Sequence, residues 1–294
     1  MSLTHTIEYW ALLCFARLLC ILPRKWSFAI GSAIGAFGWA IGMRQKLVLE
    51  NIAVARPEAD EKELKRLGKQ AAKNFGRTIT EFIRYGIKDR DLISDLVEIK
   101  GIEELKTALQ GGKGAIVLTG HFGAWAIYFA AMSMAGVPLS LLVGKQHNKK
   151  VDDFILKIPG DRVEFISKGR TAIKKILAKL TAGRAVVMVA DQHAGKSGVV
   201  VPFLGKNAST LPLPGSFAVK YQAPVFIMTG QRKPDGTHTV TIEPIEISAS
   251  EDSEDPKIEV LKAYNHKLGR VVASCPEQYF WYHRRWREES ENSQ

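Results

Sequence analysis

The chain has few of the residues that build disulfide frameworks or metal centres. Its 294 residues include three scattered cysteines, and neither a CxxC nor an HExxH pattern occurs. Structural metal sites bring such ligands together at short, regular spacings. We therefore expect neither a disulfide framework nor a metal site, and we expect a reducing compartment.

Long hydrophobic runs are also scarce, and two of them lie in the N-terminal part. Residues 9–23 are apolar except for Arg17, and residues 26–43 carry no charge. Neither run clearly reaches the roughly 20 residues that cross a bilayer. The start of the chain matches a secretory signal poorly, because it lacks a basic cluster and contains Glu8. We predict that residues 1–45 form a membrane anchor or an interfacial helical hairpin, with a buried helical pair as the alternative.

Glycine is spaced regularly within the second apolar run. Gly31, Gly35, Gly38 and Gly42 recur every three or four residues, which predicts a smooth helical stripe for close packing. Basic residues follow each apolar run, as they do at the anionic cytoplasmic surface of a membrane.

Acidic residues are fewer than basic ones, because the chain has 41 lysines and arginines and 30 aspartates and glutamates. The formal charge of +11 suits nucleic acid, an anionic membrane surface, or an acidic substrate such as a phosphorylated glycolipid or a phosphopantetheine carrier. The chain contains no helix-turn-helix and no basic–aromatic RNA module, so we do not expect nucleic acid as a partner.

From residue 46 onward the pattern is that of an α/β domain, 46–294. Apolar residues recur at helical spacing across 57–84. Short β-branched runs then alternate with helical stretches, which predicts a mostly parallel central sheet flanked by helices. The expected strands are 96–99, 115–119, 139–143, 163–166, 185–189, 225–229 and 237–242. The expected helices are 102–109, 124–134, 151–158, 171–180, 215–221 and 257–273.

The strongest candidate for chemistry is His121, which lies where a buried strand is expected to end and a helix to begin. Gly120 and Gly123 permit a tight turn there. Ligands bind beyond the carboxyl ends of the strands in open parallel sheets. In that position His121 is either a general base that deprotonates a substrate hydroxyl or a turn residue that caps the helix.

Four blocks of sequence carry a resemblance to a known family. They are Gly-His-Phe-Gly-Ala-Trp-Ala at 120–126, Phe-Ile-Ser-Lys-Gly at 165–169 with Ala-Asp-Gln at 190–192, Val-Pro-Phe-Leu-Gly at 201–205 with Ala-Ser-Thr at 208–210, and Pro-Glu-Gln-Tyr-Phe-Trp-Tyr-His-Arg-Arg-Trp at 276–286. In this order they resemble the lipid A biosynthesis (lauroyl/myristoyl) acyltransferase family, within the lysophospholipid acyltransferase superfamily. The first block is similar to that family's Gly-His-Phe-Gly-Asn-Trp-Glu.

The resemblance implies an acyltransferase fold with an N-terminal membrane-associated helical segment. It also implies transfer of a fatty acyl chain from acyl carrier protein, or from coenzyme A, to a hydroxyl of a lipid A precursor. The expected place is the cytoplasmic face of the bacterial inner membrane, with no metal and no bound cofactor. In this resemblance His121 corresponds to the catalytic base, and Asp191 lies in a block near the active site. The candidate substrate contacts are Gly123, Trp125, Lys145, Arg170, Gln192, Phe203 and Thr210.

An acyl chain needs an apolar tunnel, because each buried methylene contributes roughly 0.8 kcal/mol. Large apolar side chains follow the histidine and recur in the third block. Each of them either lines such a tunnel or packs in the core. These residues are Phe122, Trp125, Tyr128, Phe129, Met132 and Phe203.

One departure from the family bears on catalysis, because Ala126 occupies the position of its catalytic glutamate. A carboxylate there would hold one imidazole tautomer and stabilise the imidazolium, and alanine can do neither. One explanation is an engineered Glu-to-Ala change that leaves this form inactive. The other is a natural variant that borrows another carboxylate, with Asp191 as the candidate, or that has lost activity.

Further alternatives remain for the acceptor and for the last block. The acceptor is either a lipid A precursor or another glycolipid, such as a phosphatidylinositol mannoside. A catalytically dead, lipid-binding homologue is the alternative from a different class. The tryptophans, histidine and arginines of residues 281–287 either grip a phosphate, lie at the lipid interface or anchor the C-terminus against the domain.

Overall fold

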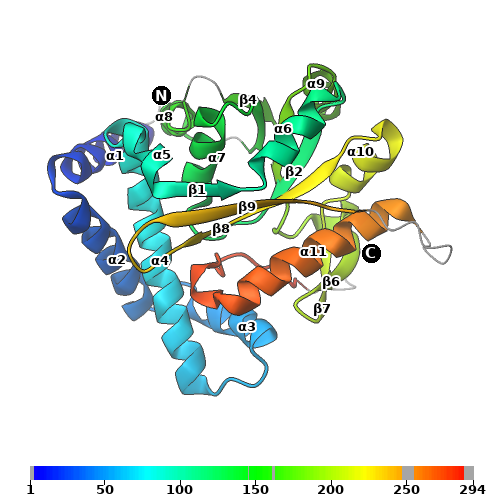
Figure 1. Ribbon diagram of the computed structural model, residues 1–294. Helices are drawn as coiled ribbons and strands as arrows, with labels where there is room; N and C mark the ends of the chain where they lie inside the picture. Colours follow the sequence, from blue (N-terminus) through cyan, green and yellow to red (C-terminus); the bar gives the residue numbers. More distant parts are fainter. Residues whose placement is uncertain (1–2, 145, 161–162, 247–254, 288–294) are drawn as a thin grey trace.

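A seven-stranded sheet forms the centre of the protein, seen in a computed structural model that describes residues 3–144, 146–160, 163–246 and 255–287 (Figure 1). The strand order is β1-β9-β8-β2-β5-β3-β4, and every neighbouring pair is parallel except β8 and β9. The predicted mostly parallel sheet is confirmed. The strands are β1 (Val97–Lys100), β2 (Ala115–Thr119), β3 (Leu139–Val143), β4 (Glu164–Ser167), β5 (Ala185–Val189), β8 (Val225–Arg232) and β9 (His238–Pro244).

A two-stranded antiparallel hairpin lies outside this sheet and is absent from the sequence prediction. It consists of β6 (Val199–Phe203) and β7 (Lys206–Thr210). Pro202 falls inside β6, and proline argues against a strand except at a sheet edge. The hairpin has two edges of its own, so the proline is tolerated there.

Side chains alternate along the central strands and supply two separate apolar cores. Ile116 and Leu118 of β2 belong to one core, whereas Ala115 and Val117 belong to the other. Because helices cover both faces, β5 is apolar throughout and β2 is apolar up to Thr119. The first core includes α9 (Ala172–Thr181), α10 (Leu213–Tyr221) and α11 (Pro256–Ser274), and the second includes α5 (Ile93–Leu96), α6 (Ile102–Gln110) and α7 (Trp125–Met134).

The first four helices of the chain gather at one end of the sheet (Figure 1). The helix predicted across 57–84 is present as α4. The side chain of Asp60 caps it by accepting a hydrogen bond of 2.7 Å from the Glu63 N–H. A further helix, α8 (Lys149–Lys157), packs against α1. The four helices are α1 (Leu3–Ile21), α2 (Arg24–Ala40), α3 (Gln45–Ala55) and α4 (Glu61–Ile87).

Glycines bring α2 and α4 into close contact. A Cβ added at Gly35 would lie 2.0 Å from the Ala72 carbonyl oxygen, and one at Gly76 would lie 2.0 Å from the Gly31 carbonyl oxygen. The predicted packing stripe is therefore confirmed for Gly31 and Gly35. It is wrong for Gly42, which follows the end of α2 with a φ of +79°.

Arg84 of α4 fixes the turn between α1 and α2. Its guanidinium donates to the carbonyl oxygens of Leu19 and Leu22 and forms an ion pair with Asp89. The Ser27 hydroxyl also donates to the Leu19 carbonyl, at 2.7 Å. The start of the chain is thus hydrogen-bonded into the rest of the fold.

The N-terminal helices carry much apolar surface on the outside. Within the described residues no single helix is long and apolar enough to cross a membrane, although α2 and α3 qualify together as a pair bent by 100°. The division of the chain at residue 45, and the membrane role of the first segment, stay predictions. The exposed apolar side chains of this region are Leu3, Ile7, Trp10, Leu18, Ile21, Trp26, Ile34, Phe37, Ile41 and Met43.

A buried ion pair joins α4 to the sheet. The side chains of Glu81 in α4 and Arg232 in β8 are 0% and 4% exposed, and Arg232 Nε lies 3.0 Å from Glu81 Oε1. The same guanidinium donates to Thr78 Oγ1 at 3.0 Å and to Asn74 Oδ1 at 2.8 Å. Burial raises the pKa of Glu81, but the charge and hydrogen bonds of Arg232 outweigh it and the pKa is lowered.

Substituting Glu81→Ala leaves the buried Arg232 guanidinium without its carboxylate. We expect the free energy of unfolding to fall by about 3–5 kcal/mol. Glu61→Ala is the matched control, because it breaks an exposed pair with Lys65, and we expect a much smaller effect. Denaturant unfolding followed by circular dichroism measures both. Equal losses in the two variants would contradict the role assigned to the buried pair.

Candidate active site

His121 lies directly after β2, in the turn that leads into α7. Two glycines allow this turn to approach its neighbours. A Cβ at Gly120 would lie 3.1 Å from Asp191 Oδ2. Gly123 has a φ of +60°, and a Cβ there would lie 2.4 Å from the Gly230 carbonyl oxygen. Side chains at these two positions would displace the loop that presents the imidazole.

Asp191 holds His121 through two hydrogen bonds. It follows β5, which is parallel to β2 and adjacent to it, so the loops after both strands emerge at the same edge. Asp191 Oδ1 lies 2.8 Å from His121 Nδ1, and Asp191 Oδ2 accepts from the His121 backbone N–H at 2.8 Å. The Asp191 side chain is 2% exposed and that of His121 is 21% exposed. The carboxylate is thus sealed, while part of the imidazole is open.

This geometry selects one tautomer of the neutral imidazole. Burial raises the pKa of Asp191, but the charge of His121 and its hydrogen bonds lower it more, and the pKa stays below its ordinary value. An ionised carboxylate can only accept hydrogen bonds, so the proton of the neutral ring resides on His121 Nδ1. The other ring nitrogen, Nε2, is then an unprotonated base.

Aromatic rings lie on two sides of His121, and an apolar groove begins beside one of them. The His121 ring centroid is 5.1 Å from that of Trp125 and 5.7 Å from that of Phe280. Phe280 also lines a groove of about 390 Å³ between α2 and α4, which we call the apolar groove. Its walls include Ile34, Gly35, Phe75, Ile79, Phe280 and Tyr282.

The C-terminal segment, residues 276–287, pairs with the loop that carries His121. The Phe280 N–H donates to the His121 carbonyl oxygen at 2.9 Å, and the Gly123 N–H donates to the Gln278 carbonyl oxygen at 2.9 Å. An antiparallel bridge joins the two stretches between these bonds. The last block of the sequence therefore completes the histidine loop.

Arg285 ties the same segment to the loop after β5 and to β7. Its buried guanidinium donates to the carbonyl oxygens of Gln192 and Ser209, and to Thr210 Oγ1 at 2.8 Å. Trp281 is 1% exposed. The sequence left three roles open for residues 281–287. The contacts of Arg285 and Trp281 are those expected if this segment anchors the C-terminus against the domain.

Comparison with known proteins decides the family. The model of the bacterial lipid A biosynthesis acyltransferase family matches residues 1–288. The chain belongs to this family. It is 22% identical to the lipid A biosynthesis palmitoleoyltransferase of Escherichia coli (strain K12) and, likewise, to the lipid A biosynthesis acyltransferase of Shigella flexneri. Both alignments span 265 residues, 88% of this chain and 84% of the relative.

Among solved structures, the chain is similar to the 1-acyl-sn-glycerophosphate acyltransferase of Thermotoga maritima. The TM-score is 0.38 and the sequence identity is 15%, over 85% of this chain and 98% of that chain. The resemblance of the sequence blocks to the lipid A acyltransferase family is thus confirmed by the family model and not by this structural likeness.

In this lipid A acyltransferase family member, several candidate substrate contacts lie in the interior. Phe203 is 1% exposed and stacks on Trp286, with 5.7 Å between ring centroids. Thr210 is fully buried and bonded to Arg285, and Gly123 is buried in its turn. Their roles in substrate binding stay predictions. The large side chains predicted as tunnel walls are also in the core, namely Phe122, Tyr128, Phe129 and Met132.

The remaining candidates lie in different surroundings. Trp125 contacts the His121 ring, whereas Arg170 is exposed in the turn between β4 and α9. Ala126 is partly exposed in the first turn of α7. Gln192 follows Asp191 and contributes its carbonyl to Arg285, while Lys145 lies outside the described residues.

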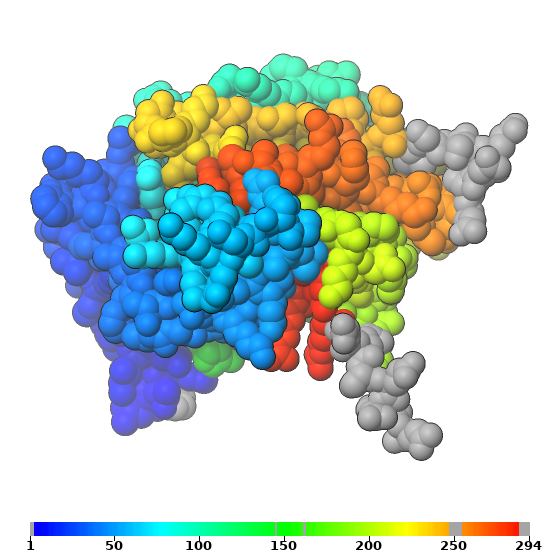
Figure 2. Space-filling view, turned by 90° about the horizontal axis from the view of Figure 1, so that it is seen from below, coloured from blue at the N-terminus to red at the C-terminus, as the bar shows by residue number. Residues whose placement is uncertain are grey.

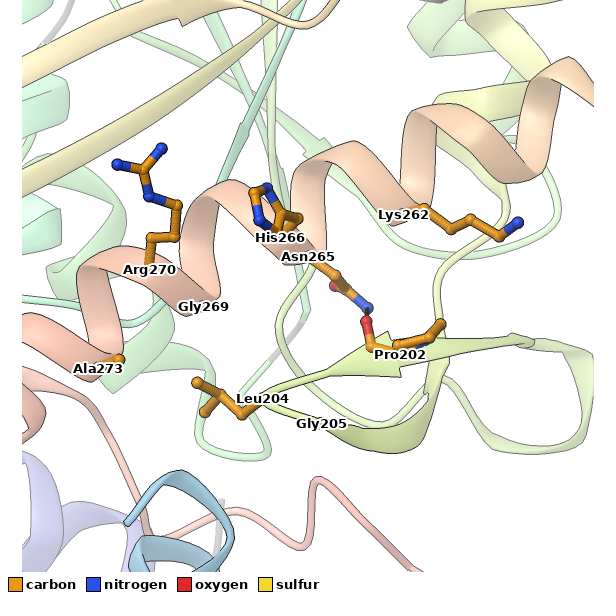
Figure 3. A pocket seen from close by; sticks show the side chains of 9 residues that line it. All are labelled: Pro202, Leu204, Gly205, Lys262, Asn265, His266, Gly269, Arg270 and Ala273. Carbon is orange, nitrogen blue, oxygen red and sulfur yellow. Dashed lines mark hydrogen bonds between the residues drawn. The ribbon is translucent and has the colours of Figure 1, made fainter. Parts of the chain in front are cut away.

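The apolar groove itself was not part of the sequence prediction, which looked for a tunnel in the residues after His121. The signal was present in the glycine stripe of α2, because Gly31, Gly35 and Gly38 line this groove. A second hollow, of about 430 Å³, lies between α11 and the β6–β7 hairpin and shares no lining residue with the groove (Figure 3).

Substituting Asp191→Asn removes the charge that holds the imidazole in one tautomer. We expect the rate of acyl transfer, the reaction that gives the family its name, to fall by about 10²–10⁴-fold. Asp235→Asn is the matched control, because this exposed carboxylate lies in the β8–β9 turn, and its rate should be unchanged. A folded Asp191→Asn protein with full activity would show that the imidazole works without the carboxylate.

Proposed function

We propose that this protein transfers a fatty acyl chain from an acyl thioester to a hydroxyl of a lipid A precursor. One observation carries the proposal. The buried Asp191 carboxylate is hydrogen-bonded to Nδ1 of His121, so Nε2 is free to act as a base. The wall of an apolar groove includes Phe280, whose ring centroid is 5.7 Å from that of His121. Membership in the lipid A acyltransferase family supports the reaction class and the acceptor.

His121 Nε2 removes the proton of the acceptor hydroxyl as its oxygen attacks the thioester carbonyl carbon. The C–S bond of the tetrahedral intermediate then breaks, and the imidazolium returns the proton to the leaving thiolate. Asp191 stabilises the imidazolium and keeps the ring in one orientation. The products are an ester and a free thiol, and the sequence of steps needs neither a metal nor a bound cofactor.

The donor is an acyl-acyl carrier protein or an acyl-coenzyme A, since both present the chain as a thioester on a phosphopantetheine arm. We assign the acyl chain to the apolar groove, whose walls include Ile34, Phe75 and Ile79. Each methylene buried there contributes roughly 0.8 kcal/mol. The groove runs along α2, so the chain enters from the side of the N-terminal helices.

We place these helices at the cytoplasmic face of the bacterial inner membrane. Trp10, Trp26 and Phe37 are exposed on α1 and α2, and tryptophan favours the interfacial zone of a bilayer. Exposed Arg24 and Lys25, at the start of α2, suit anionic lipid head groups. This arrangement brings the apolar groove to the level of the lipid.

Under this proposal Asp191 supplies the carboxylate that Ala126 cannot, so the chain with alanine at this position is competent. An inactivated form, in which a glutamate has been lost from position 126, is the alternative. The competent form and the inactivated form can be distinguished by measuring whether the chain with Ala126 turns over its substrates.

The test compares the unaltered chain with its His121→Ala and Ala126→Glu variants. Labelled acyl-acyl carrier protein and acyl-coenzyme A are offered with a lipid A precursor in detergent micelles. We expect turnover by the unaltered chain, a loss of at least about 10²-fold in His121→Ala, and less than about a tenfold change in Ala126→Glu. Flotation of His121→Ala with vesicles, at the level of the unaltered chain, controls for membrane association.

Turnover that appears only after Ala126→Glu would establish the inactivated form and refute the role given to Asp191. The absence of turnover in every form, with vesicle binding intact, would instead establish a lipid-binding homologue.

A further inference from the structure

A third hollow, which is polar, opens beside the loop that follows β5. It has a volume of about 1180 Å³ and lies between α3, the loop after β5, the β6–β7 hairpin and the C-terminal segment. Figure 2 shows the C-terminal segment (red) between α3 (blue) and the hairpin (yellow-green) on this face. We call this hollow the basic basin, and its lining includes Arg44, Lys46, His193, Lys206, Arg284 and Arg287.

Positive charge dominates the basic basin. Five of its lining residues are lysine or arginine, and one, Glu50, is acidic. Glu50 is 3.9 Å from Lys46 at an exposed position. In the part of the chain that the structure describes, no carboxylate lies within 4.0 Å of Lys206, Arg284 or Arg287. The excess of charge is therefore not neutralised within these residues.

The basic basin adjoins the proposed catalytic pair. His193, on its wall, is two residues from Asp191, and the His193 N–H donates to His283 Nε2 at 2.8 Å. His283 lines the same wall, and burial lowers its pKa, which keeps it neutral and free to accept.

Arg44 connects the basic basin to the apolar groove, because it lines both. Its Nη1 donates to the Tyr282 carbonyl oxygen at 2.8 Å, which fixes the guanidinium at their common rim. The apolar groove and the basic basin thus meet at Arg44, and the groove extends to Phe280, a ring neighbour of His121. That layout suits an amphiphile whose reacting hydroxyl lies between its acyl chains and an anionic group.

We infer that the basic basin binds a phosphate ester carried by a substrate of the acyl transfer, and that Arg284, Arg287 and Lys206 are its principal contacts. The inference rests on the proposed function for the identity of the reaction. Guanidinium groups bind phosphate oxygens through paired, charge-assisted hydrogen bonds, and lysine adds a mobile point charge. The volume accommodates a sugar-sized head group together with its phosphate. The phosphate belongs either to the glycolipid acceptor or to the phosphopantetheine arm of the donor.

The test measures binding in the His121→Ala background, where we expect turnover to be at least about 10²-fold slower. The probes are a synthetic acylated glycolipid in two forms that differ only in a sugar phosphate, and an acyl-phosphopantetheine thioether in phosphorylated and dephosphorylated forms. We expect one phosphorylated probe to bind at least about tenfold more tightly than its dephosphorylated form. The double substitution Arg284→Gln/Arg287→Gln, and separately Lys206→Gln, should reduce this ratio.

A control pair removes the same charge elsewhere. Lys220→Gln/Arg270→Gln alters exposed residues of α10 and α11, and Arg270 lies on the hollow of Figure 3, away from the basic basin. This pair should keep the full ratio. Unchanged melting temperatures in all variants would show that the fold is intact.

The binding ratios of the two probes distinguish the possible sources of the phosphate. If the basic-basin substitutions lower the affinity ratio of the phosphorylated to the dephosphorylated glycolipid, the phosphate belongs to the acceptor. If they lower the corresponding ratio for the thioether, it belongs to the donor. Ratios near one for both probes, or equal losses in the control pair, would overturn the inference. So would an effect confined to anionic vesicles, which would make the arginines a membrane contact. Selective phosphate binding without turnover in the unaltered chain would refute the proposed function, but it would still support the basic basin as a phosphate-binding site.

Discussion

The rest of the site depends on the contact between the Asp191 carboxylate and the His121 imidazole. It forms because β2 and β5 are adjacent and parallel, so their following loops emerge at one edge. Gly120 leaves the space that the carboxylate fills. A buried carboxylate is stable only when it is fully hydrogen-bonded and paired. The buried Asp191 therefore requires the adjacency of β2 and β5, the small residue at Gly120 and the imidazole of His121 together.

The C-terminal segment holds this arrangement from outside the sheet. Its backbone pairs with the histidine loop at Phe280, and Arg285 reaches the loop after β5 and the β6–β7 hairpin. The same segment contributes Phe280 to the apolar groove and Arg284 to the basic basin. A block that anchors the active-site loops therefore also forms parts of both hollows.

Local pattern was sufficient for much of the fold. The strands 115–119, 139–143 and 185–189 were predicted to the residue, because each is a short apolar run bounded by polar or glycine-rich sequence. The sequence also placed His121 at a strand end and offered Asp191 as a candidate carboxylate, and the structure brings these two side chains into contact. The pairing of residues 278–280 with 121–123 could not be predicted. It joins segments more than 150 positions apart, and no periodicity in the sequence signals it. The groove was hidden for the same reason, because its walls combine α2, α4 and the C-terminus.

The central claim is that an ionised Asp191 holds the proton of the neutral His121 ring on Nδ1 and leaves Nε2 bare. Nitrogen-15 NMR of the ring-labelled protein, above the pH at which the imidazole titrates, tests this most directly. The account predicts a protonated Nδ1 and an unprotonated Nε2 for His121, and a loss of this tautomer preference when Asp191 is replaced by asparagine. A ring protonated on Nε2 in the unaltered chain would contradict it.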